Sequence, residues 1–273
     1  MNSLSITTII LTYNEEKHIR RCVENVYAIS EKIYVIDSFS TDATSIICSE
    51  YSKVEFVQHA WPGNQADQFN WALLSLPIKT EWILRLDADE FMSESLIREI
   101  YDTLPGLPIS VSGCVMKRDV IFAGKRIRFG KMGNVSLLRL WRKDKAFVEK
   151  RLMDEHVILK EGDSIKLKHY FFDDNINGVD SWLIKHMNYA SREAEMIVAD
   201  LSPAENGRDM QKNIYYIFPK YVRGFLFFVL RYVLLGGFLD GKPGFLWHFL
   251  QCFWYRTLVD IKIEELSKKS ELC

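Results

Sequence analysis

Short apolar runs alternate with amphipathic segments along the first hundred residues of the chain. Apolar or β-branched residues dominate four runs with the length of buried strands, 5–13, 32–38, 54–58 and 81–86. Between them, apolar side chains recur at helical spacing over 15–29, 64–76 and 94–104. Ser40-Thr41-Asp42 offers N-cap chemistry for one more helix. This alternation predicts a parallel sheet covered on both faces, with its loops gathered at the strand carboxyl ends.

The pattern changes after the Pro105-Gly106-Leu107-Pro108 segment. Three further runs, 111–122, 135–141 and 164–171, have strand character and are separated by glycine-containing turns without strong helices. They predict antiparallel additions to the sheet. Helical spacing returns over 179–200, and the remaining tail is rich in aromatic residues.

Composition narrows the class of protein. The 273 residues suffice for one large α/β domain with an appendage, and 48% hydrophobic with 26% charged residues is typical of a folded globular protein. A formal net charge of -1 gives no reason to expect nucleic-acid binding. Five scattered cysteines without a CxxC pair indicate neither a disulfide framework nor a zinc site, and no export signal precedes the first strand. We therefore expect a cytoplasmic protein.

The most informative segment is an apolar run that ends in Asp87-Ala88-Asp89. A buried parallel strand that stops there would deliver two carboxylates to the sheet edge where α/β folds bind ligands. Carboxylate oxygens suit Mg²⁺ or Mn²⁺ carrying a nucleotide diphosphate. An Asp-x-Asp pair also occurs in turns and helix caps, and Ser93 could cap a helix that begins near Glu94.

Polar segments follow the other predicted strands as well. They are Thr12-Tyr13-Asn14-Glu15, the stretch from Asp37 to Asp42, and the stretch from Gly63 to Asn70. With the Asp-x-Asp pair, this set resembles the inverting family 2 glycosyltransferases, specifically bacterial enzymes that build lipopolysaccharide core, O-antigen or exopolysaccharide. The resemblance implies an α/β fold of the GT-A type, a Rossmann-like mixed sheet, here with a C-terminal helical extension. Two positions depart from the common pattern, since Phe39 replaces a glycine and Phe69 replaces an arginine.

The resemblance also implies roles for individual residues. Asp37 would hydrogen-bond the uracil of a UDP-sugar, while Tyr13 and Glu15 would line the nucleoside pocket. The full set implied to bind the nucleotide sugar is Thr12, Tyr13, Glu15, Asp37, Ser40, Gln68, Arg85, Asp87 and Ala88. For Gln68, an ordinary polar helix start is an equal alternative. Because Phe69 stands where the family has an arginine, the charge facing the diphosphate would come from the metal, Arg85 or another basic residue.

Metal binding is implied in the same way. The resemblance assigns Mg²⁺ or Mn²⁺ to Asp89 and Asp87, with His169 as a further ligand from a late position that completes the metal shell in several GT-A enzymes. A half-buried strand histidine is the alternative for His169.

A general base must take the proton from the acceptor hydroxyl in an inverting transfer. The acid pair Asp154-Glu155 follows the predicted antiparallel strands, and adjacent residues on an extended segment point to opposite sides. Only one of the two would therefore face the site, and the sequence leaves both open. A solvated acidic turn balanced by Lys150 and Arg151 is the alternative.

Basic residues gather between 117 and 143, and Arg118, Arg126 and Arg139 are candidates for binding the phosphates of a lipid-linked acceptor. The tail from Ile214 to Ile263 mixes aromatic residues with Lys220, Arg223 and Arg231, which interrupt any membrane-spanning stretch. We expect it to lie on the cytoplasmic membrane surface. Packing on the catalytic domain or on a second subunit is the alternative.

The sequence thus predicts a metal-dependent enzyme at the inner face of the cytoplasmic membrane, with possible oligomers. Its expected parts are a nucleotide-sugar-binding half over 1–104, an acceptor-binding half over 105–178 and a helical extension over 179–273. A membrane-docked scaffold without catalysis is one alternative. A nucleotidyltransferase is disfavoured, because the loop after the first strand is acidic rather than glycine-rich and basic.

Overall fold

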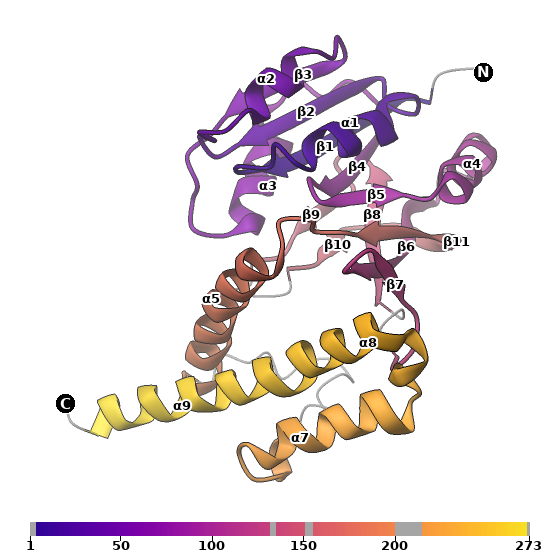
Figure 1. Cartoon of the computed structure of the whole chain (residues 1–273). Coiled ribbons are helices and arrows are strands. Elements are labelled where there is room, and N and C mark those ends of the chain that lie inside the picture. The colour runs from indigo at the N-terminus through magenta and orange to yellow at the C-terminus, as the bar shows by residue number, and fades with distance from the viewer. Residues whose placement is uncertain (1–3, 132–134, 151–154, 200–214, 272–273) are drawn as a thin grey trace. The chain divides into compact units, whose positions relative to one another are not determined.

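The computed structural model describes residues 4–131, 135–150, 155–199 and 215–271 (Figure 1). The chain divides into two compact units. The first consists of Met1–Ile121 with Asn134–Ile176, and the second consists of Phe122–Gly133 with Asn177–Cys273.

A mixed sheet organises the first unit (Figure 1). Its strands run in the order β3-β2-β1-β4-β8-β6-β11-β5. Their bounds are β1 (Ile6–Thr12), β2 (Lys32–Asp37), β3 (Val54–Gln58), β4 (Trp82–Asp87), β5 (Glu90–Met92), β6 (Val111–Phe122), β8 (Val135–Arg142) and β11 (Asp163–Asp173). The first four strands are parallel, as predicted, and β8 is antiparallel to both β4 and β6.

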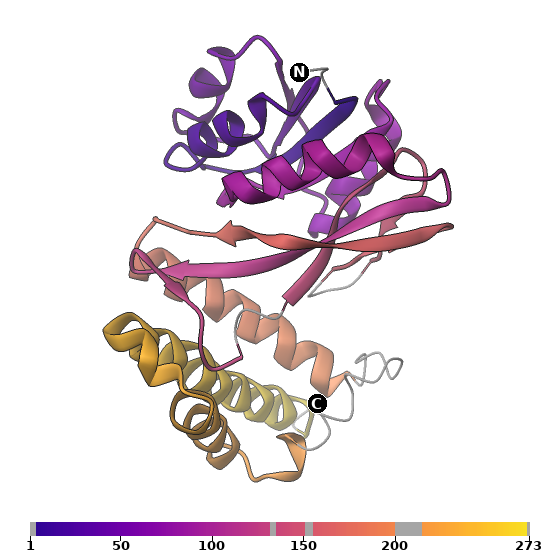
Figure 2. The ribbon, with the colours of Figure 1, turned by 90° about the vertical axis from the view of Figure 1, so that its right-hand side faces the viewer.

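The prediction of antiparallel additions is confirmed only in part. Strand β11 runs parallel to β6, so its carboxyl end points the same way as that of β6 (Figure 2). The short β5, which the hydrophobic pattern did not reveal, pairs antiparallel with the end of β11. A separate hairpin of β9 (Ala146–Val148) and β10 (Val157–Leu159) follows β8.

Helices cover both faces of the parallel strands. They are α1 (Ile19–Tyr27), α2 (Thr44–Ser49), α3 (Gln65–Ser75) and α4 (Glu94–Thr103), and the 3₁₀ turn η1 (Leu104–Gly106) follows α4. Alternation along the strands separates two cores. Ile10 and Leu84 face the core under α1 and α4, whereas Ile9 and Ile83 face the core under α3.

Helix α1 begins at Ile19, four residues later than the sequence predicts, and the amides of Glu15 and Glu16 before it bond to the next loop. The Glu15 amide donates to Thr44 Oγ1 and the Glu16 amide to Asp42 Oδ2, both over 3.0 Å. These bonds join the loop after β1 to the loop after β2. Asp42 accordingly serves the start of α2, whose Thr44 amide it also accepts.

From Asn177 onward the described residues of the second unit form helices, and its shorter segment carries the strand β7 (Lys125–Ile127). The helical elements are α5 (Val179–Val198), α7 (Val222–Phe228), the π-helical η2 (Val229–Leu234), the 3₁₀ turn η3 (Gly237–Asp240), α8 (Gly241–His248), the π-helical η4 (Phe249–Trp254) and α9 (Tyr255–Glu271). Helices α5 and α9 pack side by side (Figures 1 and 2). Ala190 and Ala194 admit the close approach of Tyr255, Val259 and Ile263.

Among the described residues, no single helix is long and apolar enough to cross a membrane. One bent pair, Val222–Leu234 with Gly237–Lys268, passes by length and composition, with 69° between its two parts.

Candidate active site

The Asp-x-Asp pair lies where the sequence predicts, at the carboxyl end of β4 beside β1. Asp87 and Asp89 are half-buried and Ala88 between them is buried. The helix-cap alternative does not describe this pair, because Ser93 caps α4 by accepting the Leu96 amide over 3.1 Å. The two carboxylates therefore remain at the sheet edge where α/β folds bind ligands.

Two buried arginines face Asp87. Arg85 Nη2 lies 3.7 Å from Asp87 Oδ1, and Arg139 Nη2 lies 3.7 Å from Asp87 Oδ2. Arg139 comes from β8, which reaches this position because it pairs with β4. Positive charge thus stands on both sides of the first aspartate.

Glu90 contacts both Arg139 and the backbone of Asp87. Its Oε1 lies 2.6 Å from Arg139 Nη2, and its Oε2 accepts the Asp87 amide over 3.0 Å. Burial raises the pKa of Glu90 to about 8, and Arg139 acts in the opposite direction. The sequence analysis did not single out Glu90, because its burial and its contact with Arg139 arise only in the fold.

Arg85 lies against Phe69, the residue that replaces the usual arginine of the resembled pattern. Its guanidinium carbon is 5.1 Å from the centre of the Phe69 ring, and its Nη2 donates to Gln65 Oε1 over 3.3 Å. Burial lowers the pKa of Arg85, while Asp87 raises it. Arg85 is therefore positioned to supply the positive charge that α3 lacks.

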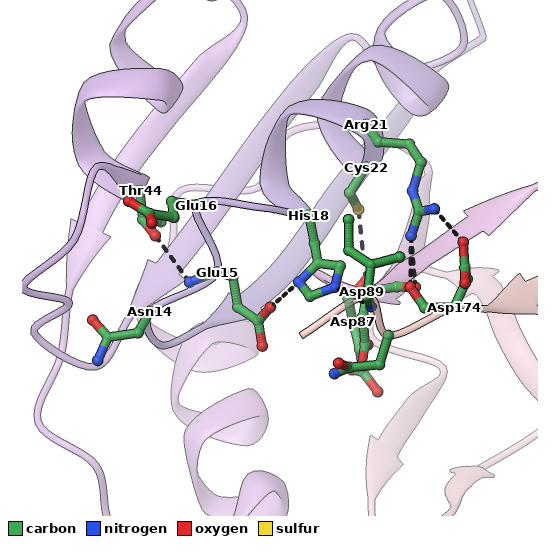
Figure 3. A network of polar contacts seen from close by, with 12 residues as sticks. Asn14, Glu15, Glu16, His18, Arg21, Cys22, Thr44, Asp87, Asp89 and Asp174 are labelled. Carbon is green, nitrogen blue, oxygen red and sulfur yellow. Dashed lines mark hydrogen bonds and ion pairs between the residues drawn. The ribbon is translucent and has the colours of Figure 1, made fainter. Parts of the chain in front are cut away.

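The loop after β11 meets Asp89 from the other side. The Asp174 amide donates to the Asp89 carbonyl over 3.0 Å, and Asn175 Nδ2 donates to Asp89 Oδ2 over 3.1 Å. Arg21 on α1 forms an ion pair with Asp174 and donates to its carbonyl over 2.8 Å (Figure 3). The strand-end rule that identified Asp87 would also have identified Asp174 and Asn175, had β11 been predicted to run parallel.

His18 links the loop after β11 to the loop after β1. It is fully buried, its Nδ1 contacts Glu15 (Figure 3), and its Nε2 accepts the Ile176 amide over 2.9 Å. Because Nε2 accepts, the proton resides on Nδ1 and is donated to Glu15. Glu15, predicted to line the nucleoside pocket, thus also holds a buried histidine.

His169 is placed differently from the expectation. It lies within β11 beside α4, where its Nδ1 is 2.8 Å from Glu99 Oε2. Glu99 also accepts the amides of Lys168 and His169, and these bonds help to hold its pKa low although burial raises it. The described contacts do not bring His169 to Asp87 and Asp89, because the residues that reach Asp89 are Asp174 and Asn175, directly after β11.

The residues at this edge fit a hard divalent cation that completes its coordination with diphosphate and water. The donors are two carboxylates, and no group of three or more His, Cys, Asp or Glu placed to hold a metal occurs in the described part of the chain. Thr12 Oγ1, Arg85 Nε and Arg139 Nε are buried without a hydrogen-bond partner among the described residues. Polar atoms in that state favour a polar ligand nearby.

The loops proposed for the nucleoside are linked by Asp37 and Ser40. Asp37 is fully buried and accepts both the amide (2.8 Å) and the hydroxyl of Ser40, whose Oγ accepts the Asn14 amide over 2.7 Å. Asp37 therefore holds this turn, and its predicted bond to uracil stays a prediction. Tyr13 and Phe39 project from the two loops with 59% and 54% of their surface exposed. Phe39 adopts a φ of 63°, a conformation that usually selects glycine.

Gln68 is buried rather than part of a solvated helix start. Its Oε1 lies 2.6 Å from His59 Nδ1, and its Nε2 donates to Ser38 Oγ over 3.3 Å. It thus braces the loops after β2 and β3. Any contact with a nucleotide sugar remains a prediction.

The two candidate bases differ in what the structure describes. Asp154 lies outside the described residues. Glu155 is half-buried, and its charge is near enough to Arg85 to oppose, in small part, the lowering of the Arg85 pKa by burial. The hairpin that carries Glu155 is closed by the Glu149 amide, which donates to the His156 carbonyl over 2.9 Å.

Of the three arginines expected to bind acceptor phosphates, Arg139 lies in this site. Arg118 lies on β6, where its Nη1 is 3.9 Å from Asp173 Oδ2. Arg126 belongs to the second unit.

Comparisons with known proteins show which family this chain resembles. Residues 7–156 match the model of glycosyl transferase family 2. An uncharacterised glycosyltransferase of Rickettsia bellii (strain RML369-C) is 36% identical over 95 residues, which cover 35% of this chain and 31% of that protein. The lipopolysaccharide core biosynthesis glycosyltransferase LpsC of Rhizobium meliloti (strain 1021) is 30% identical over 106 residues, 37% of each protein. The matched region thus spans about a third of the length of these relatives.

A solved structure resembles almost the whole chain. It is the mannosyltransferase PcManGT from Pyrobaculum calidifontis, with a TM-score of 0.53 and 13% identity, over 96% of this chain and 88% of that one. This chain has the GT-A glycosyltransferase fold, and a helical region follows it. Because the family model covers more than half of its residues, this chain belongs to glycosyl transferase family 2.

Proposed function

We propose that the protein transfers a sugar from a nucleotide diphosphate donor to a glycan hydroxyl with inversion at the anomeric carbon. The observation that carries the proposal is the meeting of Asp87 with two buried arginines at the sheet edge, with Glu155 within electrostatic reach of Arg85. In this proposal, the aspartate and the two arginines bind the metal and the diphosphate, and the Glu155 carboxylate acts as the base.

The proposed reaction is a single displacement. The Glu155 carboxylate, or that of Asp154, takes the proton of the acceptor hydroxyl as the hydroxyl oxygen attacks the anomeric carbon. The bond from that carbon to the diphosphate oxygen breaks on the opposite face, and the nucleoside diphosphate leaves. Asp87 and Asp89 would hold Mg²⁺ or Mn²⁺, which neutralises charge on a leaving diphosphate. Arg85 and Arg139 add fixed positive charge that needs no reorganisation during the reaction.

The donor is proposed to be a UDP-sugar. Tyr13 and Phe39 are exposed aromatic side chains on the two loops at the nucleoside side, and they provide faces on which a base can stack. The neighbour PcManGT was solved with GDP-Man and Mn²⁺, which makes a GDP-sugar the matched comparison for this assignment.

The acceptor is proposed to be a growing, lipid-linked bacterial surface glycan. The similarity to LpsC, named for lipopolysaccharide core biosynthesis, supports this class of acceptor. The enzyme would then work at the inner face of the cytoplasmic membrane, where a lipid-linked acceptor is held.

The test is a release assay for UDP and GDP with a panel of UDP- and GDP-sugars and lipid-linked glycan acceptors. We expect release from one class of donor, dependent on Mn²⁺ or Mg²⁺ and abolished by chelator, with a product of inverted anomeric configuration in NMR spectra. Retention of configuration would refute the single displacement. Failure of every nucleotide sugar to react and to raise the thermal stability of the protein would refute the proposed function.

A further inference from the structure

An exposed apolar stripe runs along the helix formed by α7 and η2. Its members recur at helical spacing and leave 40–72% of their surface exposed, and they are Val222, Phe225, Leu226, Leu230, Val233 and Leu234. No described element of the second unit covers them. Leu234 is the most exposed, at the turn that leads into η3.

The stripe continues across that turn. Phe238, Leu239, Phe245 and Phe249 are exposed by 51%, 56%, 42% and 37%. Ring contacts join the two helices, since the Phe228 ring centre lies 6.2 Å from that of Phe245 and 6.3 Å from that of Phe249. We call the ten exposed residues of these two sets the apolar face. A patch formed by so many adjoining side chains exceeds what a soluble surface usually carries without a function.

Acids are rare in the segment that carries the apolar face. Between Tyr215 and Val259 the sequence holds a single acid, Asp240. Asp240 is buried, and its Oδ2 accepts the amides of Arg128 and Phe129, each over 2.9 Å. Its charge is therefore directed into the unit rather than toward the face.

Those two amides belong to a basic loop, 125–131, that is distant in sequence from the apolar face. The loop contains Lys125, Arg126, Arg128 and Lys131 and no acid. Gly130 donates to the Leu235 carbonyl over 3.0 Å, and Arg231 Nη1 donates to the Lys131 carbonyl over 3.1 Å. The fold thus fixes a cationic loop to the turn of the apolar face, and Arg128 and Lys131 are exposed there.

Of the three cations that the sequence suggested, Lys220 is exposed and pairs with Glu264, whereas the other two are less accessible. Arg223 is buried in an ion pair with Asp260, so it is not available to lipid headgroups. Arg231 is partly buried, and its guanidinium carbon lies 5.1 Å from the centre of the Phe227 ring. Exposed cations at the turn include Arg128, Lys131 and Lys242.

We infer that the apolar face and the basic loop together form a docking surface for a bilayer with anionic headgroups. Apolar and aromatic side chains with adjoining cations, in a segment whose single acid is buried, match the interface of such a bilayer. A second copy of this chain fits less well, because self-association would bring like-charged loops together. The inference concerns the second unit and does not depend on the sugar donor.

The experiment is flotation of the full-length protein with phosphatidylcholine vesicles, with and without phosphatidylglycerol. We expect binding that requires the anionic lipid and weakens with salt. Leu234→Glu with Leu239→Glu should weaken it at least about tenfold, and so should Arg128→Glu with Lys131→Glu. The matched controls are Leu74→Glu, at an apolar position that is 87% exposed, and Arg98→Glu, whose side chain is 79% exposed, both in the first unit.

Thermal unfolding of each variant establishes that it is folded, and release of nucleoside diphosphate with a soluble acceptor is measured separately. Loss of vesicle binding with retained release supports the docking surface. Equal binding by wild type and both double variants overturns it. It is also overturned if wild type ignores vesicles and is a dimer that Leu234→Glu with Leu239→Glu converts to a monomer.

Discussion

The side-chain amide of Asn70 binds the backbone of Val148 in both directions. Asn70 Nδ2 donates to the Val148 carbonyl over 2.7 Å, and the Val148 amide donates to Asn70 Oδ1 over 2.9 Å. Val148 ends β9, directly before the connection that carries Glu155. Helix α3 therefore fixes the root of the hairpin that supplies the proposed base.

Replacing Asn70 by Ala should lower kcat about tenfold or more while changing the KM for the donor little, because the proposed base would lose its support. Two buried backbone groups would also lose their partner, at a cost of about 1–3 kcal/mol. Lys150→Ala is the control. The exposed ammonium of Lys150 contacts Asp67, which lies on α3 as Asn70 does. Unchanged turnover in stable Asn70→Ala protein would show that this bond has no part in positioning the base.

Replacing Asp89 by Ala should abolish metal-dependent transfer and leave the fold intact, because a half-buried carboxylate at the sheet edge is lost. Isothermal titration with Mn²⁺ in the presence of UDP measures the metal site directly. Asn175→Ala should weaken metal affinity by about 10–100-fold, as expected for a residue that orients a ligand. Full activity of Asp89→Ala in excess chelator would exclude this metal site.

Replacing Glu155 by Gln should lower kcat by about 10²–10⁴-fold with little effect on donor binding, because only proton removal from the acceptor is lost. Asp154→Asn is the matched variant at the neighbouring position. Single-turnover rates and donor affinity are the measurements. If both variants turn over normally, the base lies elsewhere. If only Asp154→Asn is slow, Asp154 rather than Glu155 is the base.

Replacing Arg223 by Met should destabilise the second unit by about 3–5 kcal/mol, because it leaves Asp260 buried without its cation. Adding Asp260→Asn should recover part of this loss, since an amide still accepts the Tyr221 amide that Asp260 Oδ2 binds over 2.8 Å. Urea unfolding measures both variants. Arg98→Met, at an exposed position, should change the free energy of unfolding by less than about 0.5 kcal/mol. A change at Arg223 as small as this control would contradict the importance of the ion pair.

Acidification should destabilise the second unit through His248. Burial, with a contribution from Arg231, lowers the pKa of this fully buried residue to about 4, against 6.5 for an ordinary histidine. Above pH 6.5 both folded and unfolded forms are neutral. As the pH falls from 6.5 to 4 only the unfolded form gains a proton, so stability decreases by up to about 3 kcal/mol.

Unfolding of wild type and His248→Asn at pH 7 and pH 5 separates this effect from a change in packing. The expected result is a smaller decrease of stability between the two pH values in the variant. Equal decreases would place the responsible group elsewhere.

Much of the first unit follows from local pattern. The strands β3 and β6 and the start of α4 fall where the sequence predicts them, and so does the start of α5 in the second unit, because burial imposes a period of two on strands and of 3.6 on helices. The Asp87-Ala88-Asp89 pair was found for the same reason, since a buried run that stops at two acids marks a strand end. The cap of α4 at Ser93 is equally local.

The partners of that pair were decided by tertiary structure. Arg139 faces Asp87 because β8 pairs with β4, and Asn175 reaches Asp89 because β11 runs parallel to β6. Strand order and direction depend on pairings between distant segments, which hydrophobic periodicity does not encode.

The same division between local pattern and tertiary structure applies to both ends of the chain. The sequence by itself determined the alternating strands and helices of the first hundred residues and the apolar, basic character of the tail. Tertiary structure decided that Arg223 is buried against Asp260, that the loop at 125–131 lies at the turn of the apolar face, and that His169 pairs with Glu99. A sequence does not distinguish a solvated charged side chain from a paired one, because only the fold brings the partner into contact.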